Sequence, residues 1–341
     1  MPTVLFTGFP GFLGSELLPR ILQRSADTTA VCLVQPKFAD LARERARAFG
    51  NRIRLIEGDI TAPLDAQTTD MIEVFHLAAI YDLSVSRERG MKINVEGTRN
   101  VLDFAERCPM LRRFHYVSTC YVSGRYDGMF HEDDLDVGQT FNNFYEETKF
   151  LAEVEVRKRS LPITIYRPSV VVGDSATGAT QKFDGPYYVM QWLLRQPRVA
   201  ILPVVGRPSR YRFNVVPRDF IIAAIAELSK KGESKCYQLA DPAPLTVDET
   251  IDVIAHAARR HVVRLPLPRS VAKFAIDRIP GVYRLMRIPS AAIDYFAHPT
   301  TYDTTNTQRD LRLRVPRLSE YAERLVAFAE AHPEISASGM A

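Results

Sequence analysis

Tyr145 and Lys149 have the types and the spacing of an acid and its supporting cation. They lie four residues apart in Tyr145-Glu146-Glu147-Thr148-Lys149, so they share one face of the helix predicted over residues 143–159. A free phenol has a pKa of about 10, and a nearby ammonium favours its ionised form, so we expect Lys149 to lower the pKa of Tyr145. Tyr145 can then give a proton to a carbonyl oxygen as hydride reaches the carbon. Alone, this spacing also fits a surface helix whose lysine extends into solvent.

Two hydroxyls upstream supply a partner for that acid. Ser118 and Thr119 follow a short apolar run predicted as a strand over residues 114–117. Open parallel sheets bind ligands at the carboxyl ends of their strands, so either hydroxyl can hydrogen-bond the reacting carbonyl. Because adjacent strand residues point in opposite directions, we expect only one of the two to do so.

Three glycines near the N-terminus predict a dinucleotide site. Gly8, Gly11 and Gly14 follow the first predicted strand and open a helix. In that context they allow a tight turn, close approach of the backbone to a pyrophosphate, and packing of helix on strand, and the helix N-terminus favours phosphate. Lys149 can then bond a nicotinamide ribose. The alternative is a tight turn in an α/β protein without a cofactor.

The residues after the second predicted strand bear on which nicotinamide cofactor is used. A carboxylate there would bind a ribose 2′-hydroxyl, but the chain has Val34-Gln35-Pro36-Lys37. Lys37 can pair with a 2′-phosphate, which favours NADPH. A merely solvated Lys37 leaves NADH open.

Apolar runs alternate with amphipathic stretches over the first 173 residues. Strands are predicted at 3–6, 30–34, 53–56, 72–76, 114–117 and 163–172, and helices at 12–23, 38–49, 87–107 and 143–159. Strands that are apolar on both faces belong in a parallel sheet covered by helices on both sides. The sequence therefore predicts an α/β, doubly wound Rossmann fold.

The pattern changes after Gly173. Glycines and prolines fill residues 175–212 around one helix (187–195), and the stretches that follow predict a helix at 216–228 begun by Pro217, a strand at 237–240 and a helix capped by Thr246 and Glu249. The remainder is predicted to be helical. We expect a dinucleotide-binding domain at 1–173, to which 213–240 return, and a smaller substrate-binding lobe at 174–212 and 241–335.

Composition and charge narrow the class of protein. The chain has 341 residues and a net charge of +4, too small a charge to argue for nucleic acid. Its four cysteines are scattered and lack metal-ligand spacing, so we expect reduced thiols, a cytoplasmic protein and no metal. Residues from Pro2 onward predict a β-strand and not a signal peptide. The apolar runs of the sequence are too short to cross a bilayer.

Taken together, the motifs resemble the extended short-chain dehydrogenases/reductases. Within them the chain is most similar to the fatty acyl-CoA reductase and thioester reductase branch, with its male-sterility-type NAD-binding domain. Residues 117–122, 167–175, 214–217 and 239–246 favour this branch over sugar-nucleotide enzymes. With Gly124 as the anchor, Thr119 matches the catalytic Ser/Thr, with Ser118 one place before it.

The resemblance also implies roles for individual residues. Tyr145 and Lys149 match the catalytic pair, Asp59 the aspartate that contacts adenine, and Asn94 the helix asparagine near the active site. His76-Leu77-Ala78-Ala79 matches the segment that lines the cofactor, and Tyr166-Arg167-Pro168-Ser169 the turn beside the nicotinamide. The implied cofactor-binding residues are Gly8, Phe9, Pro10, Gly11, Phe12, Leu13, Gln35, Lys37, Asp59, Ile60, Leu77, Ala78, Ala79, Asn94, Val117, Tyr145, Lys149, Pro168, Ser169 and Val170.

The activity implied is reduction of an acyl thioester, or of the aldehyde or ketone derived from one, by NAD(P)H with Tyr145 as proton donor. No fused adenylation or carrier domain is visible, so we expect the acyl group on CoA or on a separate carrier protein. Gln35 replaces an arginine that many NADP-using relatives carry, so the choice of cofactor stays open. Alternatives are a ketone or hydroxysteroid-type reductase, an NAD-dependent sugar-nucleotide epimerase or dehydratase, and a cofactor-binding regulator without turnover. A homodimer also stays open.

Residues 259–296 mix bases with apolar side chains. One interpretation is a lid that grips an apolar tail while its cations meet CoA or carrier phosphates. A second is transient contact with an anionic membrane surface, and a third is a domain face whose arginines are only solvated. His76 ends a buried strand, and we expect it to be a packed core residue and not a base.

Overall fold

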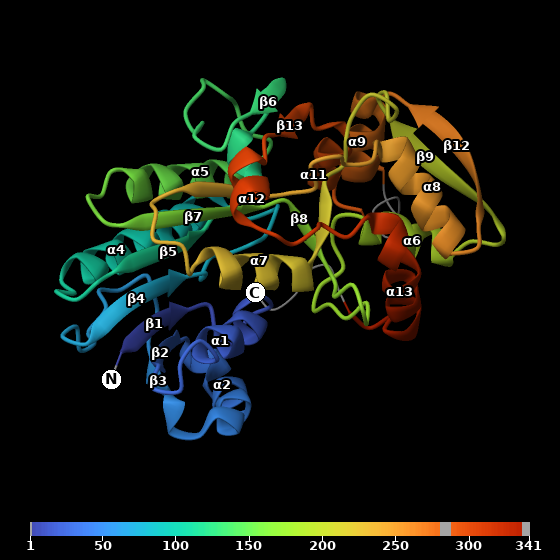
Figure 1. Ribbon diagram of the computed structural model, residues 1–341. Coiled ribbons are helices and arrows are strands. Elements are labelled where there is room, and N and C mark those ends of the chain that lie inside the picture. The colour runs from blue at the N-terminus through green and yellow to red at the C-terminus, as the bar shows by residue number, and fades with distance from the viewer. Residues whose placement is uncertain (1, 280–287, 336–341) are drawn as a thin grey trace.

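The computed structural model describes residues 2–279 and 288–335 (Figure 1). Its centre is one sheet of seven parallel strands. In sheet order the strands are β11 (Cys236–Leu239), β7 (Ile163–Pro168), β5 (Arg113–Val117), β4 (Met71–His76), β1 (Thr3–Thr7), β2 (Thr29–Val34) and β3 (Ile53–Glu57). The predicted doubly wound fold is confirmed, and its strand order reverses between β1 and β4, where such sheets open a ligand-binding crevice.

Helices cover both faces of the sheet because its strands are apolar on both sides. One face packs against α1 (Gly14–Leu22), α2 (Ala39–Ala46) and α7 (Arg218–Leu228). The other packs against α4 (Gly97–Glu106) and α5 (Phe144–Arg157). A continuous helical stretch leads into α4 through α3 (Arg87–Gly90) and the π-helical turn η3 (Met91–Glu96). Short 3₁₀ turns complete this part: η1 (Pro36–Phe38), η2 (Arg47–Arg52) and η4 (Cys120–Ser123).

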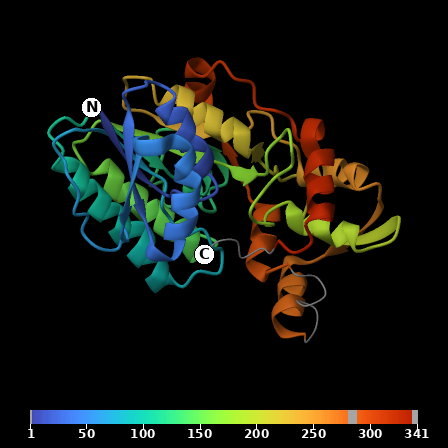
Figure 2. The same cartoon turned by 90° about the horizontal axis from the view of Figure 1, so that it is seen from below.

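A second lobe lies to one side of the sheet in both views (Figures 1 and 2). Its core joins α6 (Tyr187–Leu194), α8 (Val247–Ala257) and α13 (Leu318–Ala331) with strand β9 (Val199–Val205). Thr246 and Glu249 form the predicted capping box at the start of α8. The remaining elements of the lobe are β12 (His261–Leu267), α9 (Arg269–Arg278), α11 (Ser290–Ile293) and η5 (Asp294–Ala297).

Three predictions about elements were wrong. The strand expected over 163–172 breaks at Ser169: β7 stays in the main sheet, whereas β8 (Val170–Val172) pairs with β10 (Val215–Pro217). Pro217 therefore ends a strand, and α7 begins at the next residue. The part expected to be all helical contains β12, which pairs in parallel with β9, and β13 (Thr300–Tyr302), which pairs with β6 (Gly128–Phe130) ahead of α12 (Thr305–Asp310).

Several bases of the mixed 259–296 stretch make contacts inside the lobe. Arg264 pairs with Asp248 and Asp252, and Arg269 and Lys273 both pair with Asp294. Residues 280–287 of this stretch lie outside the described part of the chain. Exposed apolar side chains also occur in it, among them Phe274 at 63% exposure.

No helix within 2–279 and 288–335 combines the length and the apolar character needed to cross a membrane. In the same described residues, no three His, Cys, Asp or Glu side chains are grouped as metal ligands would be. All four cysteines are buried free thiols.

Candidate active site

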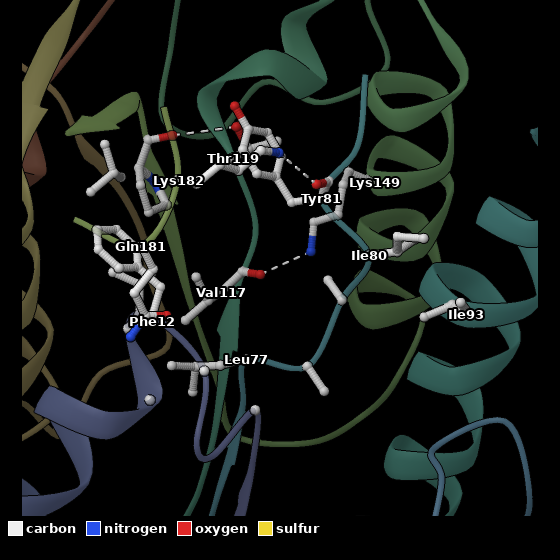
Figure 3. Close-up of a pocket in the computed structure, with 18 of the residues that line it drawn as sticks. Phe12, Leu77, Ile80, Tyr81, Ile93, Val117, Thr119, Lys149, Gln181 and Lys182 are labelled. Carbon is white, nitrogen blue, oxygen red and sulfur yellow. Dashed lines mark hydrogen bonds between the residues drawn. The ribbon is translucent and has the colours of Figure 1, made fainter. Parts of the chain in front are cut away.

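A cavity of about 410 Å³ runs from the glycine loop after β1, past the carboxyl ends of β4 and β5, to residues 180–184 of the second lobe (Figure 3). Its lining includes the predicted catalytic residues and all but two of the predicted cofactor residues. The exceptions are Asp59 and Asn94. The structure thus brings together segments that are far apart in the sequence.

The glycine loop has the close backbone approach that a pyrophosphate requires. Gly8 adopts a φ of +92°, and a Cβ on Gly14 would lie only 2.3 Å from the carbonyl oxygen of Gly8. Further along the cavity, Ser169 lies in the lining, and its buried Oγ has no hydrogen-bond partner among the described residues. A glycine cradle at one end and a free buried hydroxyl at the other fit a nicotinamide dinucleotide.

Asp59 and Asn94 act on the cavity indirectly. Asp59 accepts a hydrogen bond of 2.5 Å from the side-chain amide of Gln35, which itself lines the cavity. Asn94 is buried; its Oδ1 accepts from the backbone N–H of Ile80 at 2.9 Å and its Nδ2 donates to Thr148 Oγ1 at 3.1 Å. Asn94 therefore fastens the loop after β4 to α5, and the direct cofactor contact predicted for it is not seen in the cavity lining.

Lys149 is buried and binds the end of β5. Its Nζ donates to the carbonyl oxygen of Val117 at 2.9 Å (Figure 3) and to the hydroxyl of Tyr116 at 3.0 Å. Burial lowers the pKa of Lys149 to about 7, and the charge of Glu153, one turn along α5, opposes that change. Lys149 thus lies in the cavity lining with a pKa close to neutral pH.

Tyr145 is also buried, at 8% exposure, and lies in the same lining. Burial raises the pKa of its phenol above the usual range, while a hydrogen bond with the Thr119 side chain acts in the opposite direction. The prediction that Lys149 lowers this pKa is therefore wrong for the structure as it stands, because the ammonium is directed to Tyr116 and Val117. A raised pKa keeps the phenol protonated at neutral pH, which is the form a proton donor requires.

The two candidate hydroxyls of β5 are used differently. Ser118 also lines the cavity, but its Oγ donates to Glu153 Oε2 at 2.6 Å. Glu153 is fully buried and also binds the guanidinium of Arg167, with a shortest distance of 2.6 Å. Thr119 makes the contact with Tyr145 and a long hydrogen bond of 3.4 Å to Pro168 O. Ser118, which was kept as a catalytic candidate, is therefore committed to a buried ion pair, and Thr119 is the hydroxyl available to a substrate.

His76 is a packed core residue, as predicted. Its two ring nitrogens lie 2.8 Å from Thr7 Oγ1 and 3.0 Å from Thr98 Oγ1. Burial, with a smaller effect of the Lys149 charge, lowers the pKa of His76 to about 3. A neutral ring with both nitrogens engaged is not a general base.

Sequence reasoning missed the side of the cavity that faces the second lobe. Tyr81, Tyr121, Lys182 and Asp184 line it, together with Thr180 and Gln181. Next to it is a small, nearly filled pocket of about 20 Å³ whose walls are mostly aromatic: Tyr81, Leu83, Tyr121, Tyr145, Val170, Gly185, Tyr188, Phe213, Tyr295 and Phe296. Tyr81 lies two residues after the predicted cofactor segment, but nothing in the sequence indicates that it meets a loop a hundred residues further along.

Comparison with known protein families identifies the family of the chain. Residues 6–225 match the family model described as male sterility protein, an NAD-binding family. The chain belongs to this family. Its fold and its family are those of the NAD(P)-dependent short-chain dehydrogenases/reductases, and its cofactor is a nicotinamide dinucleotide.

Individual relatives within known proteins match only part of this chain. A non-canonical nonribosomal peptide synthetase, cpsA of Aspergillus campestris, is 26% identical over 67% of this chain and 24% of its own length. A probable fatty acyl-CoA reductase 4 of Arabidopsis thaliana is 27% identical over 47% of this chain and 39% of its own length. The chain thus spans well under half of either relative.

Among solved structures, the terminal R domain from the myxalamid PKS-NRPS biosynthetic pathway superposes with a TM-score of 0.81. The match covers 98% of this chain and 91% of the R domain at 23% identity. At that identity the likeness shows the fold, which here includes both the sheet and the second lobe.

Substitution of Ser118 and of Thr119, which follow β5, tests whether their hydroxyls have different roles. We expect Thr119→Ala to lower kcat about 10²-fold, because one donor to the reacting oxygen is lost. We expect Ser118→Ala to leave kcat within about threefold and instead to lower the free energy of unfolding by about 1–3 kcal/mol, because Glu153 loses a buried partner. Steady-state kinetics and urea unfolding of both variants make the comparison. The assignment fails if Ser118→Ala is the kinetically damaged variant.

The lowered pKa of Lys149 predicts a pH dependence. If its ammonium is needed for turnover, kcat/KM should fall as pH rises through about 7, where the free enzyme loses that proton. Lys149→Arg keeps a cation at higher pH, so whatever activity it retains should lack this falling limb. The measurement is kcat/KM from pH 5 to 9 for both proteins. A limb of the same midpoint in Lys149→Arg would assign the titration to another group.

Proposed function

We propose that the protein reduces an acyl thioester, carried on CoA or on a carrier protein, to an aldehyde with NADPH. The observation that carries the proposal is the meeting of Thr119 and Tyr145 in one cavity with the glycine loop. The printed names of the relatives support it, since they include a nonribosomal peptide synthetase and a probable fatty acyl-CoA reductase.

Each residue of the site has a task in this reaction. A bound NADPH supplies the hydride. Thr119 and Tyr145 hydrogen-bond the thioester carbonyl oxygen, and Tyr145 gives it a proton as the carbonyl carbon is reduced, which leaves a hemithioacetal. The C–S bond then breaks, the hydroxyl returns its proton to Tyr145, and the sulfur leaves as thiolate and takes a proton from water. The products are an aldehyde and a free thiol.

Lys149 and Ser169 hold the cofactor in this proposal. Lys149 lies against the carboxyl end of β5, where its ammonium can reach a nicotinamide ribose. Ser169 offers its unpartnered hydroxyl to the nicotinamide carboxamide. Both groups lie in the cavity lining.

Removal of the acid tests the reaction. We expect the purified protein to oxidise NADPH in the presence of acyl-CoA or acyl-carrier substrates, and Tyr145→Phe to lower kcat by about 10²–10⁴-fold with NADPH binding unchanged. Tyr321→Phe is the matched control, because Tyr321 is a buried tyrosine of the second lobe whose hydroxyl lacks a hydrogen-bond partner among the described residues. The measurements are NADPH absorbance and fluorescence titration. Brisk turnover of ketones with none of any thioester would remove the thioester and leave a ketone reductase.

The preference for NADPH rests on Lys37, which lies in the cavity lining with its Nζ 4.8 Å from the ring centre of Phe38. We expect Lys37→Ala to lower kcat/KM for NADPH about tenfold, which corresponds to about 1.4 kcal/mol, and kcat/KM for NADH less than twofold. Lys158→Ala, at an exposed lysine on α5, is the control. Equal losses with both cofactors, or none, would mean that Lys37 does not read the 2′-phosphate.

A further inference from the structure

Lys182 joins two segments that reach the cavity from different parts of the chain. It belongs to the loop of the second lobe that precedes α6, and its Nζ donates to the backbone carbonyl of Tyr81 at 3.1 Å (Figure 3). The same ammonium lies 4.3 Å from the centre of the Tyr81 ring. Tyr81 belongs to the loop after β4, in the dinucleotide-binding part. One lysine therefore holds both the backbone and the ring of Tyr81.

Asp184 completes this contact from the same loop as Lys182. Its Oδ2 lies 3.3 Å from Lys182 Nζ, and its carboxylate is buried, at 7% exposure. The hydroxyl of Tyr81 is hydrogen-bonded to Asp184 as well. A buried carboxylate is stable only when it is paired, so Lys182 and the Tyr81 hydroxyl both hold Asp184 in place and are held by it.

Tyr81 in turn contacts the proton donor. Its ring meets the ring of Tyr145 edge-on, with centres 5.0 Å apart and planes at 70°. Edge-to-face pairs of this kind have a preferred geometry and contribute about 0.5–1.5 kcal/mol beyond burial. Tyr81 itself is 45% exposed, and its ring also forms part of the wall of the small aromatic pocket. The contacts form a chain from the second lobe to the catalytic phenol.

We propose that Lys182, Asp184 and Tyr81 form a latch that orients the Tyr145 phenol toward Thr119. In this latch Lys182 is a positioning residue: it touches neither the phenol nor Thr119 and acts through the ring of Tyr81. The catalytic consequence rests on the proposed function, whereas the geometric part does not. The reaction as described above leaves these three side chains unused, although all three line the cavity.

The kinetic test replaces Lys182 by side chains of similar length. We expect Lys182→Met to lower kcat about tenfold for the best carbonyl substrate found, with Kd for NADPH within twofold, and Lys182→Arg to recover most of the loss. Lys230→Met, at an exposed lysine after α7, makes the same chemical change away from the cavity and should have no effect. Tyr81→Leu should lose as much as Lys182→Met, and the double variant should lose no more than either single one.

A crystal structure of Lys182→Met tests the geometric part without any substrate. We expect the Tyr81 ring to leave its edge-on contact with Tyr145 while Lys149 stays bound to Val117. If the wild-type protein reduces no carbonyl compound, the proposed function fails, and this structure alone decides the latch. The latch is wrong if Tyr81 keeps its place in Lys182→Met, or if the losses of the two single variants multiply in the double variant.

Discussion

The site depends on the attachment of the carboxyl end of β5 to helix α5. Lys149 Nζ binds the carbonyl oxygen of Val117, and one turn along the helix Glu153 accepts a hydrogen bond from Ser118. A buried ammonium and a buried carboxylate are each unfavourable without such partners, so together these two bonds fix how far along the strand the helix lies. Thr119 follows Ser118 after the end of β5, and Tyr145 lies one turn before Lys149, so the attachment brings the Thr119 and Tyr145 hydroxyls together.

The sheet and the second lobe supply different sides of the cavity. The reversal of strand order between β1 and β4 opens the crevice where the glycine loop and the end of β4 meet. The second lobe contributes the loop with Lys182 and Asp184, and the aromatic side chains of Tyr188, Tyr295 and Phe296 in the adjoining small pocket. The glycine-loop side of the cavity therefore follows from the doubly wound sheet, whereas the opposite side is formed by the second lobe.

Much of the first half could be predicted because its signals are local. Apolar runs, three spaced glycines and a Tyr-x-x-x-Lys helix each depend on a few neighbouring residues, and parallel order follows from strands without a polar face. The break at Ser169 follows Arg167 and Pro168, which interrupt an otherwise apolar run, but the strand was predicted to continue through them. The pairing of β9 with β12 was missed because it joins segments about sixty residues apart, each carrying a proline.

The pKa values of Lys149 and Tyr145 could not be predicted from their spacing in the sequence. Lys149 and Tyr145 do share a helix face, but burial determines the pKa of each, and the direction in which the ammonium points depends on where β5 ends. The fate of Ser118 likewise depends on Glu153 and Arg167, which meet only in the folded chain. The spacing indicated residues that line one cavity, and burial determines their pKa values.

The most direct test of this account is a crystal structure with NADPH and an acyl-CoA analogue in which a methylene group replaces the thioester sulfur. The account predicts that the analogue's carbonyl oxygen lies within hydrogen-bond distance of both Tyr145 Oη and Thr119 Oγ1, with Ser118 still bound to Glu153. A carbonyl oxygen held by other groups, with Tyr145 directed away from it, would contradict the account.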